Sequence, residues 1–247
     1  INLVREIKMI EITNVSKTYG SKKAASHLNV TIPDGTITGF IGPNGAGKTT
    51  TINMVTGALR PDEGTIRING YDISKQPIEA RRQMVLVPDS PDLFLRLSGL
   101  EYIRFMANIY RVPKEEREKR IQQLAGEFGM EEVLTSQMES YSHGMRQKAI
   151  VMAALVCCPP VWILDEPLTG LDPSAAFLLK QKMKEHAQKG NSVFFSTHVL
   201  EVAEKLCDKI LLIEGGYIRF DGTLEQLKAL YPNKALEEIF LEATSHA

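Results

Sequence analysis

The sequence predicts an α/β protein with a mostly parallel sheet and flanking helices, an antiparallel β region at the front, and an all-helical insertion. Three observations lead to this fold class. Residues 161–164 (VWIL) are continuously apolar, as expected of a central strand in a parallel sheet. A Gly-rich turn joins the β-rich run 36–41 to a helical stretch that starts at residue 48. From residue 100 to 158, the apolar residues follow a helical period.

The first half of the chain contains further strand signals. Residues 65–69 alternate between polar and apolar and follow the turn-forming sequence PDEG at 61–64. Residues 85–87 form a short apolar strand that ends at Pro88. We expect less regular β structure in front of these strands.

The insertion is predicted to contain three helices. Residues 100–110 are aromatic-rich and amphipathic, residues 113–128 begin with Pro, and residues 144–157 end in a buried apolar run. The charge run KEEREKR in the second helix has i,i+4 pairs of opposite sign, which indicates a solvated helix face.

The α/β alternation resumes after the insertion. Asp172 followed by Pro173 predicts the start of a helix that runs to residue 190. A buried strand at 192–196 follows, and then a hairpin of 209–213 with 217–220 around two glycines. Thr223 and Gln226 have the spacing of a capping box for a final helix.

The composition excludes several classes of protein. A net charge of -1 gives no electrostatic case for binding nucleic acid. No apolar stretch approaches the roughly 20 residues that span a bilayer, and no secretory signal pattern is present. The three cysteines show no CxxC pairing and are expected to be reduced thiols in the core of a cytosolic protein.

The expected boundaries follow from these elements. Residues 1–8 precede Met9, a plausible natural start, and are set aside as an added or native extension. Residues 9–225 form the predicted catalytic domain, with its helical part at about 90–158. Residues 226–247 form a C-terminal helical tail.

A phosphate-binding motif lies between the first buried strand and its helix. The sequence GPNGAGKTT matches G-x-x-x-x-G-K-[ST] in full. Glycines allow backbone N–H groups to surround phosphate oxygens, and the following helix N-terminus favours an anion. Lys48 would reach the β and γ phosphates, and the Thr49 hydroxyl would bind Mg²⁺. The predicted nucleotide-binding residues here are Gly42, Pro43, Asn44, Gly45, Ala46, Gly47, Lys48, Thr49 and Thr50.

Two carboxylates follow the apolar strand 161–164. Because ligands bind at the carboxyl edge of open parallel sheets, both are placed near the phosphates. Asp165 is predicted to bind Mg²⁺, and Glu166 to orient or deprotonate the attacking water. With the phosphate-binding motif alone, these carboxylates fit a kinase, a GTPase or many ATPases.

Four further segments resemble the ATP-binding cassette (ABC) ATPases. YSHGMRQK at 141–148 resembles their signature motif, usually written LSGGQ. Tyr19 resembles the aromatic residue that stacks on adenine. TGLDP at 169–173 resembles the loop that crosses the dimer interface. His198, in STH, resembles the histidine that senses the γ-phosphate. The order of these motifs matches the family from about residue 9 to 223.

This resemblance implies a P-loop NTPase core that acts as a dimer. Two ATPase subunits, identical or related, would face each other head to tail, with each MgATP between one phosphate loop and the other signature. Ser142 and Gly144 would contact the partner's γ-phosphate, and Asp172 would lie at the interface. His198 would hold the water near Glu166. The resemblance also implies a separate multi-spanning permease that holds the subunit at the cytoplasmic face of the membrane.

Three positions depart from the family pattern. His143 replaces the first signature Gly, and Met145 replaces the Gln. Asp89 stands where the family has a Gln that links Mg²⁺ to the helical insertion, and Asp92 is the less favoured substitute. A carboxylate also suits Mg²⁺ as a hard oxygen ligand, but it is shorter and charged. Residues 89–110, with Phe94, Tyr102 and Phe105, are expected either to form the permease-contacting groove or to be ordinary core aromatics.

Three functions remain as alternatives. The tail LEEIFLEAT at 236–244 resembles bacterial exporters whose ATPase and permease are separate chains, which favours ATP-driven export. A soluble ABC ATPase acting on a cytosolic scaffold is the main alternative. A regulatory ATP binder without catalysis fits poorly, because Lys48, Asp165, Glu166 and His198 are all present.

Overall fold

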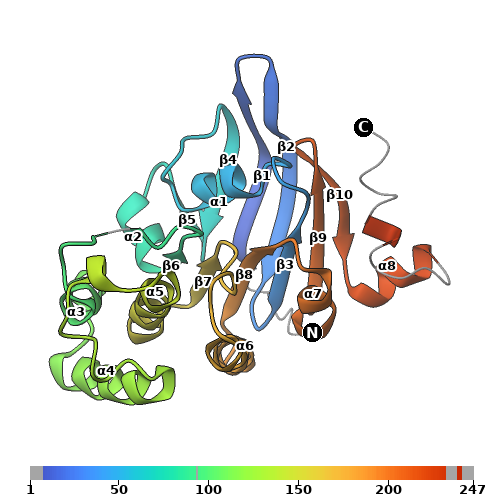
Figure 1. Ribbon diagram of the computed structural model, residues 1–247. Coiled ribbons are helices and arrows are strands. Elements are labelled where there is room, and N and C mark those ends of the chain that lie inside the picture. The colour runs from blue at the N-terminus through green and yellow to red at the C-terminus, as the bar shows by residue number, and fades with distance from the viewer. Residues whose placement is uncertain (1–7, 93, 232–237, 241–247) are drawn as a thin grey trace, which may run out of the picture.

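The computed structural model describes residues 8–92, 94–231 and 238–240, and it contains two sheets with helices between and beside them (Figure 1). The central sheet has six strands, and neighbouring strands are parallel except for the pair β9 and β10. The spatial order is β10 (Tyr217–Gly222), β9 (Lys209–Glu214), β3 (Ile37–Ile41), β8 (Ser192–Thr197), β7 (Val161–Leu164) and β6 (Met84–Val87). The predicted α/β class and its mostly parallel sheet are confirmed.

The second sheet is antiparallel and more regular than the sequence suggested. Its order is β2 (Lys22–Pro33), β1 (Lys8–Tyr19), β4 (Glu63–Ile68) and β5 (Tyr71–Asp72). The first two strands have 12 residues each and were missed because bulges interrupt their alternation. Asn14 and His27 have positive φ angles in this region.

The helix after the phosphate loop lies between the two sheets. This helix, α1 (Lys48–Val55), buries Ile52 and Met54 in a cluster that also contains Phe40 of the parallel sheet and Ile10 of the antiparallel sheet. Both sheets therefore support the start of α1, which forms one side of the nucleotide site described below.

The opposite face of the parallel sheet is covered by α5 (His143–Cys157) and α6 (Pro173–Gln188). Strand β7 shows the division directly, because Trp162 and Leu164 belong to the helix-side cluster. Val161 and Ile163 belong to the cluster facing the antiparallel sheet. A smaller third cluster contains α7 (Leu200–Leu206), α8 (Leu224–Leu230) and Ile239. The structure also contains helix α2 (Pro77–Arg82) and the 3₁₀ turn Met138–Ser140.

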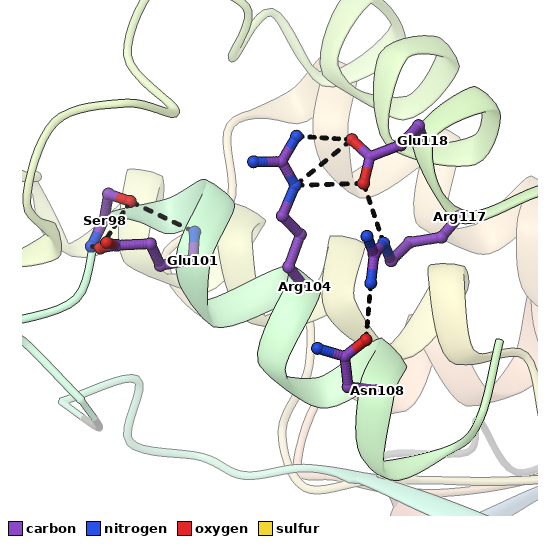
Figure 2. A network of polar contacts seen from close by, with 6 residues as sticks. All are labelled: Ser98, Glu101, Arg104, Asn108, Arg117 and Glu118. Carbon is purple, nitrogen blue, oxygen red and sulfur yellow. Dashed lines mark hydrogen bonds and ion pairs between the residues drawn. The ribbon is translucent and has the colours of Figure 1, made fainter. Parts of the chain in front are cut away.

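The helical insertion consists of α3 (Gly99–Ile109), α4 (Lys114–Phe128) and α5, at the lower left of Figure 1. Each begins within one residue of its predicted start. Figure 2 shows how α3 and α4 are joined: Arg104 and Arg117 both bind Glu118, and Arg117 also donates to Asn108.

Several predicted helix ends are also confirmed. Asp172 accepts a hydrogen bond from the Ala175 amide as the N-cap of α6, with Pro173 as the first helical residue. Thr223 and Gln226 form a reciprocal capping box at α8. The exporter-like tail 236–244 lies outside the described residues except for 238–240.

The cysteine prediction was only partly correct. All three thiols are free, and Cys157 is buried as expected. Cys158, however, is exposed; it is the C-cap of α5, in a left-handed conformation (φ 46°).

Candidate functional site

The phosphate loop connects β3 to α1, and its shape depends on glycine. Gly47, the N-cap of α1, has φ 112°, a conformation that L side chains rarely adopt. A Cβ at this position would lie 2.2 Å from the Ala24 carbonyl oxygen. Gly42 is equally confined, since its Cβ would lie 2.4 Å from the Ile213 carbonyl oxygen. The loop is therefore shaped by neighbouring strands as well as by its own sequence.

Lys48 extends back along this loop. Its Nζ donates hydrogen bonds to the carbonyls of Gly42 (2.7 Å) and Pro43 (3.2 Å). Burial lowers the pKa of Lys48, while the nearby carboxylates of Glu166, Asp165 and Asp89 oppose that shift. The ammonium thus lies near three carboxylates, in a cleft that Lys22 also lines, where phosphate oxygens could replace its bonds to the loop carbonyls.

Asp165 lies at the carboxyl end of β7 and is buried. Burial raises the pKa of its carboxyl, and the charges of Asp89 and Glu166 act in the same direction. Hydrogen bonds from Ser196 and Thr49 oppose the shift and favour the carboxylate. A cation at this position would relieve the repulsion among the three acids.

Glu166 has an unusual backbone conformation. Its φ is 47°, which is strained for a residue with a side chain, and such strain is concentrated at functional sites. The Glu166 amide donates to Ser196 Oγ at 3.0 Å, and its Oε2 lies 3.0 Å from His198 Nδ1. Ser196 donates in turn to Asp165, so one hydroxyl at the end of β8 orients both acids.

A cleft of about 260 Å³ brings most of the predicted residues together. It lies at the carboxyl edge of the parallel sheet, where ligands bind in open α/β folds. Of the residues proposed from the sequence, its lining contains Tyr19, Asn44, Gly45, Gly47, Lys48, Thr49, Thr50, Asp89, Asp165 and Glu166. Tyr19 is 51% exposed, and the Lys17 ammonium lies 5.9 Å from the centroid of its ring.

The two candidate Mg²⁺ ligands near the insertion, Asp89 and Asp92, lie in different surroundings. Asp89 lines the cleft and acts electrostatically on both Lys48 and Asp165. Asp92 instead forms an ion pair with Arg146 at 2.7 Å. The position of Asp89 therefore fits a role at the phosphates better than that of Asp92.

Seven predicted residues are absent from this lining. Gly42, Pro43 and Ala46 belong to the phosphate loop itself and His198 lies beside Glu166, whereas Ser142, Gly144 and Asp172 lie elsewhere. Ser142 is the N-cap of α5 and accepts from the Met145 amide at 3.3 Å. Gly144 lies against Gly170, whose carbonyl oxygen would be 2.7 Å from a Cβ at position 144. These residues form a second surface that begins at the N-terminus of α5.

One face of α5 holds the loop that follows Glu166. Lys148 forms an ion pair with Asp172 at 2.6 Å. Gln147, fully buried, points its amide at the Pro167 carbonyl at 3.5 Å, and its own Oε1 has no partner among the described residues. The ring of His143 covers Gly170. His143 is itself the first residue of α5, so the departure from Gly needs no unusual backbone angle.

The comparisons with known proteins agree with this geometry. The ABC transporter family model matches residues 25–169. The chain is 35% identical over 240 residues to the ABC-type transporter ATP-binding protein EcsA of Bacillus subtilis, covering 96% of this chain and 97% of that one. The chain belongs to the ABC transporter family, as an ATP-binding subunit.

Further similarities support an ABC ATPase. The SkfA peptide export ATP-binding protein SkfE of Bacillus subtilis is 34% identical over 222 residues, covering 90% of this chain and 92% of SkfE. A solved ATP-binding subunit of an ABC transporter superposes with a TM-score of 0.91 at 34% identity, covering 95% of this chain and 99% of its own. A dimeric ATP-binding cassette bound to ADP and Pi gives 0.78 at 26% identity, with 87% and 99% covered. This ABC subunit is accordingly an ATP-hydrolysing enzyme.

Some residues of the ABC site were not predicted from the sequence. Lys22 and Ala24 of β2 line the cleft, but the strand itself was not recognised. Ser196 was visible only as part of the STH motif. Lys148 is the last residue of the signature-like segment 141–148, and nothing near it in the sequence identifies Asp172 as its ion-pair partner. Within the described ranges, no helix of this ABC subunit combines the length and apolar character needed to cross a membrane.

Proposed function

We propose that the cleft binds MgATP and that a second ATPase subunit completes each catalytic site. The observation that carries the proposal is the meeting of Lys48, Asp165 and Glu166 in one cleft at the sheet edge. Tyr19 would stack on adenine, and the loop 42–50 would surround the phosphates. We further propose that residues 9–225 form one ATPase domain, with a helical part at about 90–158 and a tail from 226.

The donor set suits Mg²⁺ only in company with the nucleotide. Asp165, Asp89 and Thr49 offer hard oxygen atoms, and Mg²⁺ is commonly held by one or two carboxylates plus substrate phosphates. Among the described residues, no group of three His, Cys, Asp or Glu side chains is arranged to hold a metal by itself. When bound, Mg²⁺ would neutralise charge on the transferring phosphoryl group.

Glu166 is proposed as the residue that positions and deprotonates the attacking water. The Ser196 bond holds its backbone amide, next to a strained backbone conformation. His198, 3.0 Å away, would hold the carboxylate and reach the γ-phosphate from the end of β8. Lys48 would stabilise the charge that develops on the phosphate oxygens.

Ser142, Gly144 and Asp172 would serve the site of the other subunit. The N-terminus of α5, with a hydroxyl at its cap, is suited to an anion. Because these residues do not line this chain's own cleft, they would meet the γ-phosphate bound by a partner. The partner is a second copy or a related ATPase.

A separate permease is the proposed membrane partner, and it would hold this subunit at the cytoplasmic face. The proposed docking surface includes an exposed aromatic cluster. In it, the ring centroid of Phe94 lies 5.7 Å from those of Phe105 and of the buried Tyr102. An adjoining groove of about 420 Å³ carries the exposed Ile78 and Ile109. Of these three aromatic residues, Tyr102 is a core residue, whereas Phe94 and Phe105 are exposed. Similarity to a peptide-export ATPase favours export.

Replacing Glu166 with Gln tests the catalytic assignment. We expect kcat to fall by roughly 100- to 10,000-fold, the usual contribution of a general base, while ATP still binds. Glu185→Gln makes the same chemical change on an exposed part of α6 and should retain activity. Normal turnover by Glu166→Gln would remove Glu166 from this role.

Copurification from gently solubilised native membranes tests the partner. A multi-spanning membrane protein that follows the tagged subunit would support the transporter role, and its loss with Phe105→Asp and Ile109→Asp would locate the docking surface. Recovery of a soluble scaffold alone, under several mild detergents, would favour the cytosolic alternative and contradict the docking surface.

A further inference from the structure

The turn between β9 and β10 touches the phosphate loop from outside, although about 170 residues separate them in the sequence. The Gly216 amide donates to the Ala46 carbonyl at 3.0 Å, inside the phosphate loop. The Gly216 carbonyl accepts from the Ser26 amide of β2 at 2.8 Å. One peptide segment therefore bonds both to the loop and to the strand beside it.

The contact is too close for any side chain at position 216. Gly216 has φ 83°, and a Cβ would lie 2.9 Å from the Lys23 carbonyl oxygen and 3.0 Å from the Ala24 carbonyl carbon. These are backbone atoms of a paired strand, so they cannot move aside as a flexible side chain could. The neighbouring Gly215 also has a positive φ, 55°, but nothing lies within 4 Å of its Cβ position.

Strands β2 and β9 also confine the glycines of the phosphate loop itself. Ala24 of β2 limits Gly47, and Ile213 of β9 limits both Gly42 and Gly47. The hairpin is held in register near its turn by an ion pair between Glu214 and Arg219 at 3.2 Å, in which Glu214 is buried. The loop is thus enclosed by backbone from β2 and from the β9–β10 turn.

We propose that Gly216 is a positioning residue for nucleotide binding, which braces the phosphate loop through the Ala46 carbonyl, an acceptor that phosphate does not need. The inference rests on the proposed function, because it assumes that residues 42–50 bind the phosphates. Holding the loop before the ligand arrives lowers the cost of ordering it on binding. The Gly216 bond therefore acts on nucleotide affinity rather than on the chemical step.

The matched variants are Gly216→Ala and Gly215→Ala. Both place an L side chain at a positive φ, so both carry the backbone strain, but only the first collides with β2. We expect Gly216→Ala to weaken MgADP binding, measured by calorimetry, and to raise the KM for ATP, each by at least tenfold. The kcat of Gly216→Ala should stay within about twofold of the wild-type value. For Gly215→Ala, the MgADP affinity, the KM for ATP and kcat should all stay within about twofold of wild type.

Equal effects of the two variants, or unchanged MgADP affinity in Gly216→Ala, would overturn the inference. Lys48→Ala separates this failure from failure of the proposed function. If wild type and Lys48→Ala bind MgADP equally well, the phosphate loop assignment itself fails. If only Lys48→Ala loses binding and Gly216→Ala does not, the brace alone is wrong.

Hydrogen exchange on the wild-type protein covers the case in which Gly216→Ala does not fold. We expect MgADP to slow exchange of the Gly216 and Ser26 amides, because tightening of the loop transmits to both bonds. The exposed outer end of β10 should exchange at an unchanged rate. No change at Gly216 on saturation with MgADP would contradict the brace.

Discussion

At the scale of single residues, His143 and Gly170 form a complementary pair. Gly170 has φ 79°, and a Cβ there would lie 2.5 Å from His143 Cδ2. The imidazole that departs from the family's usual Gly therefore packs onto the loop joining Glu166 to Asp172. This contact links the start of α5, where we expect the partner's nucleotide, to the loop that follows Glu166, the proposed catalytic carboxylate.

A double-mutant cycle should measure this contact. Gly170→Ala strains the backbone in any background, but it meets the imidazole only when His143 is present. We expect the double variant His143→Ala with Gly170→Ala to be more stable than additivity predicts by about 1 kcal/mol, since residues in contact commonly couple by 0.5–3 kcal/mol. Urea unfolding of the four proteins gives the value, and additive free energies of unfolding would show that the two residues do not interact.

Individual residues also show what a sequence can predict. The loop 42–50 and the acids at 165–166 were found because their chemistry is local: adjacent residues of fixed type lead from a strand into a turn. Lys22, Ser196 and Gly216 were not found, because each reaches the site by pairing between segments far apart in the chain. The register of β2, the pairing of β7 with β8, and the hairpin β9–β10 bring them there.

At the scale of elements, the start of α3 depends on a reciprocal cap. The Ser98 hydroxyl accepts from the Glu101 amide, and the Glu101 carboxylate accepts from the Ser98 amide at 2.8 Å (Figure 2). These bonds favour the carboxylate and lower the pKa of Glu101. The sequence prediction began this helix one residue later, at 100, because the cap was not recognised.

Removing the cap should destabilise the protein. We expect Ser98→Ala to lower the free energy of unfolding by about 1 kcal/mol, and Ser98→Gly by only a few tenths, because Gly is a better N-cap than Ala. Urea unfolding of both variants gives the comparison. A smaller loss for Ala than for Gly would indicate that packing of Cβ, not capping, governs this position.

The contact between α6 and β7 should make the stability of the protein depend on pH. His186 stacks on Trp162 with ring centroids 3.8 Å apart, and burial lowers its pKa to about 4. Since the unfolded state has a histidine pKa near 6.5, it binds the proton more readily than the folded state. The stability from neutral His186 is therefore complete above about pH 6.5 and is lost as pH falls towards 4.

Replacing His186 with Phe isolates this effect. Phe keeps an aromatic ring against Trp162 but cannot take up a proton. We expect the free energy of unfolding of wild type to fall more steeply than that of His186→Phe between about pH 6.5 and 4. Trp162 is the sole tryptophan, so its fluorescence follows unfolding at this contact. Parallel pH profiles would show that His186 titrates normally in the folded protein.

At the scale of the whole molecule, the fold places the two sets of proposed site residues apart. The cleft with Lys48 lies at the edge of the parallel sheet, whereas Ser142 lies at the start of α5, outside the cleft lining. The α/β rhythm of the sequence was sufficient to predict the sheet and the insertion. The long front strands were not predicted, because bulges and positive φ residues conceal their period.

Complementation between two inactive variants tests whether these halves meet across a dimer. Lys48→Ala damages the phosphate loop, and Ser142→Asp retains a good N-cap while placing a negative charge against the partner's phosphate. Each variant alone forms dimers with two damaged sites and should be inactive. Mixed dimers contain one intact site, so an equimolar mixture should regain roughly a quarter of wild-type ATPase activity by random pairing.

The mixture should also contain ATP-dependent particles of twice the 27.5 kDa subunit mass, measured by light scattering. Tagging only the Lys48→Ala chain would then recover the Ser142→Asp chain in the presence of MgATP. An equimolar mixture of wild type with a chain that carries both Lys48→Ala and Ser142→Asp controls for simple dilution. Because each intact site needs Lys48 from one chain and Ser142 from the other, an inactive mixture of well-folded variants that do form mixed dimers would show that each chain hydrolyses ATP with its own residues alone.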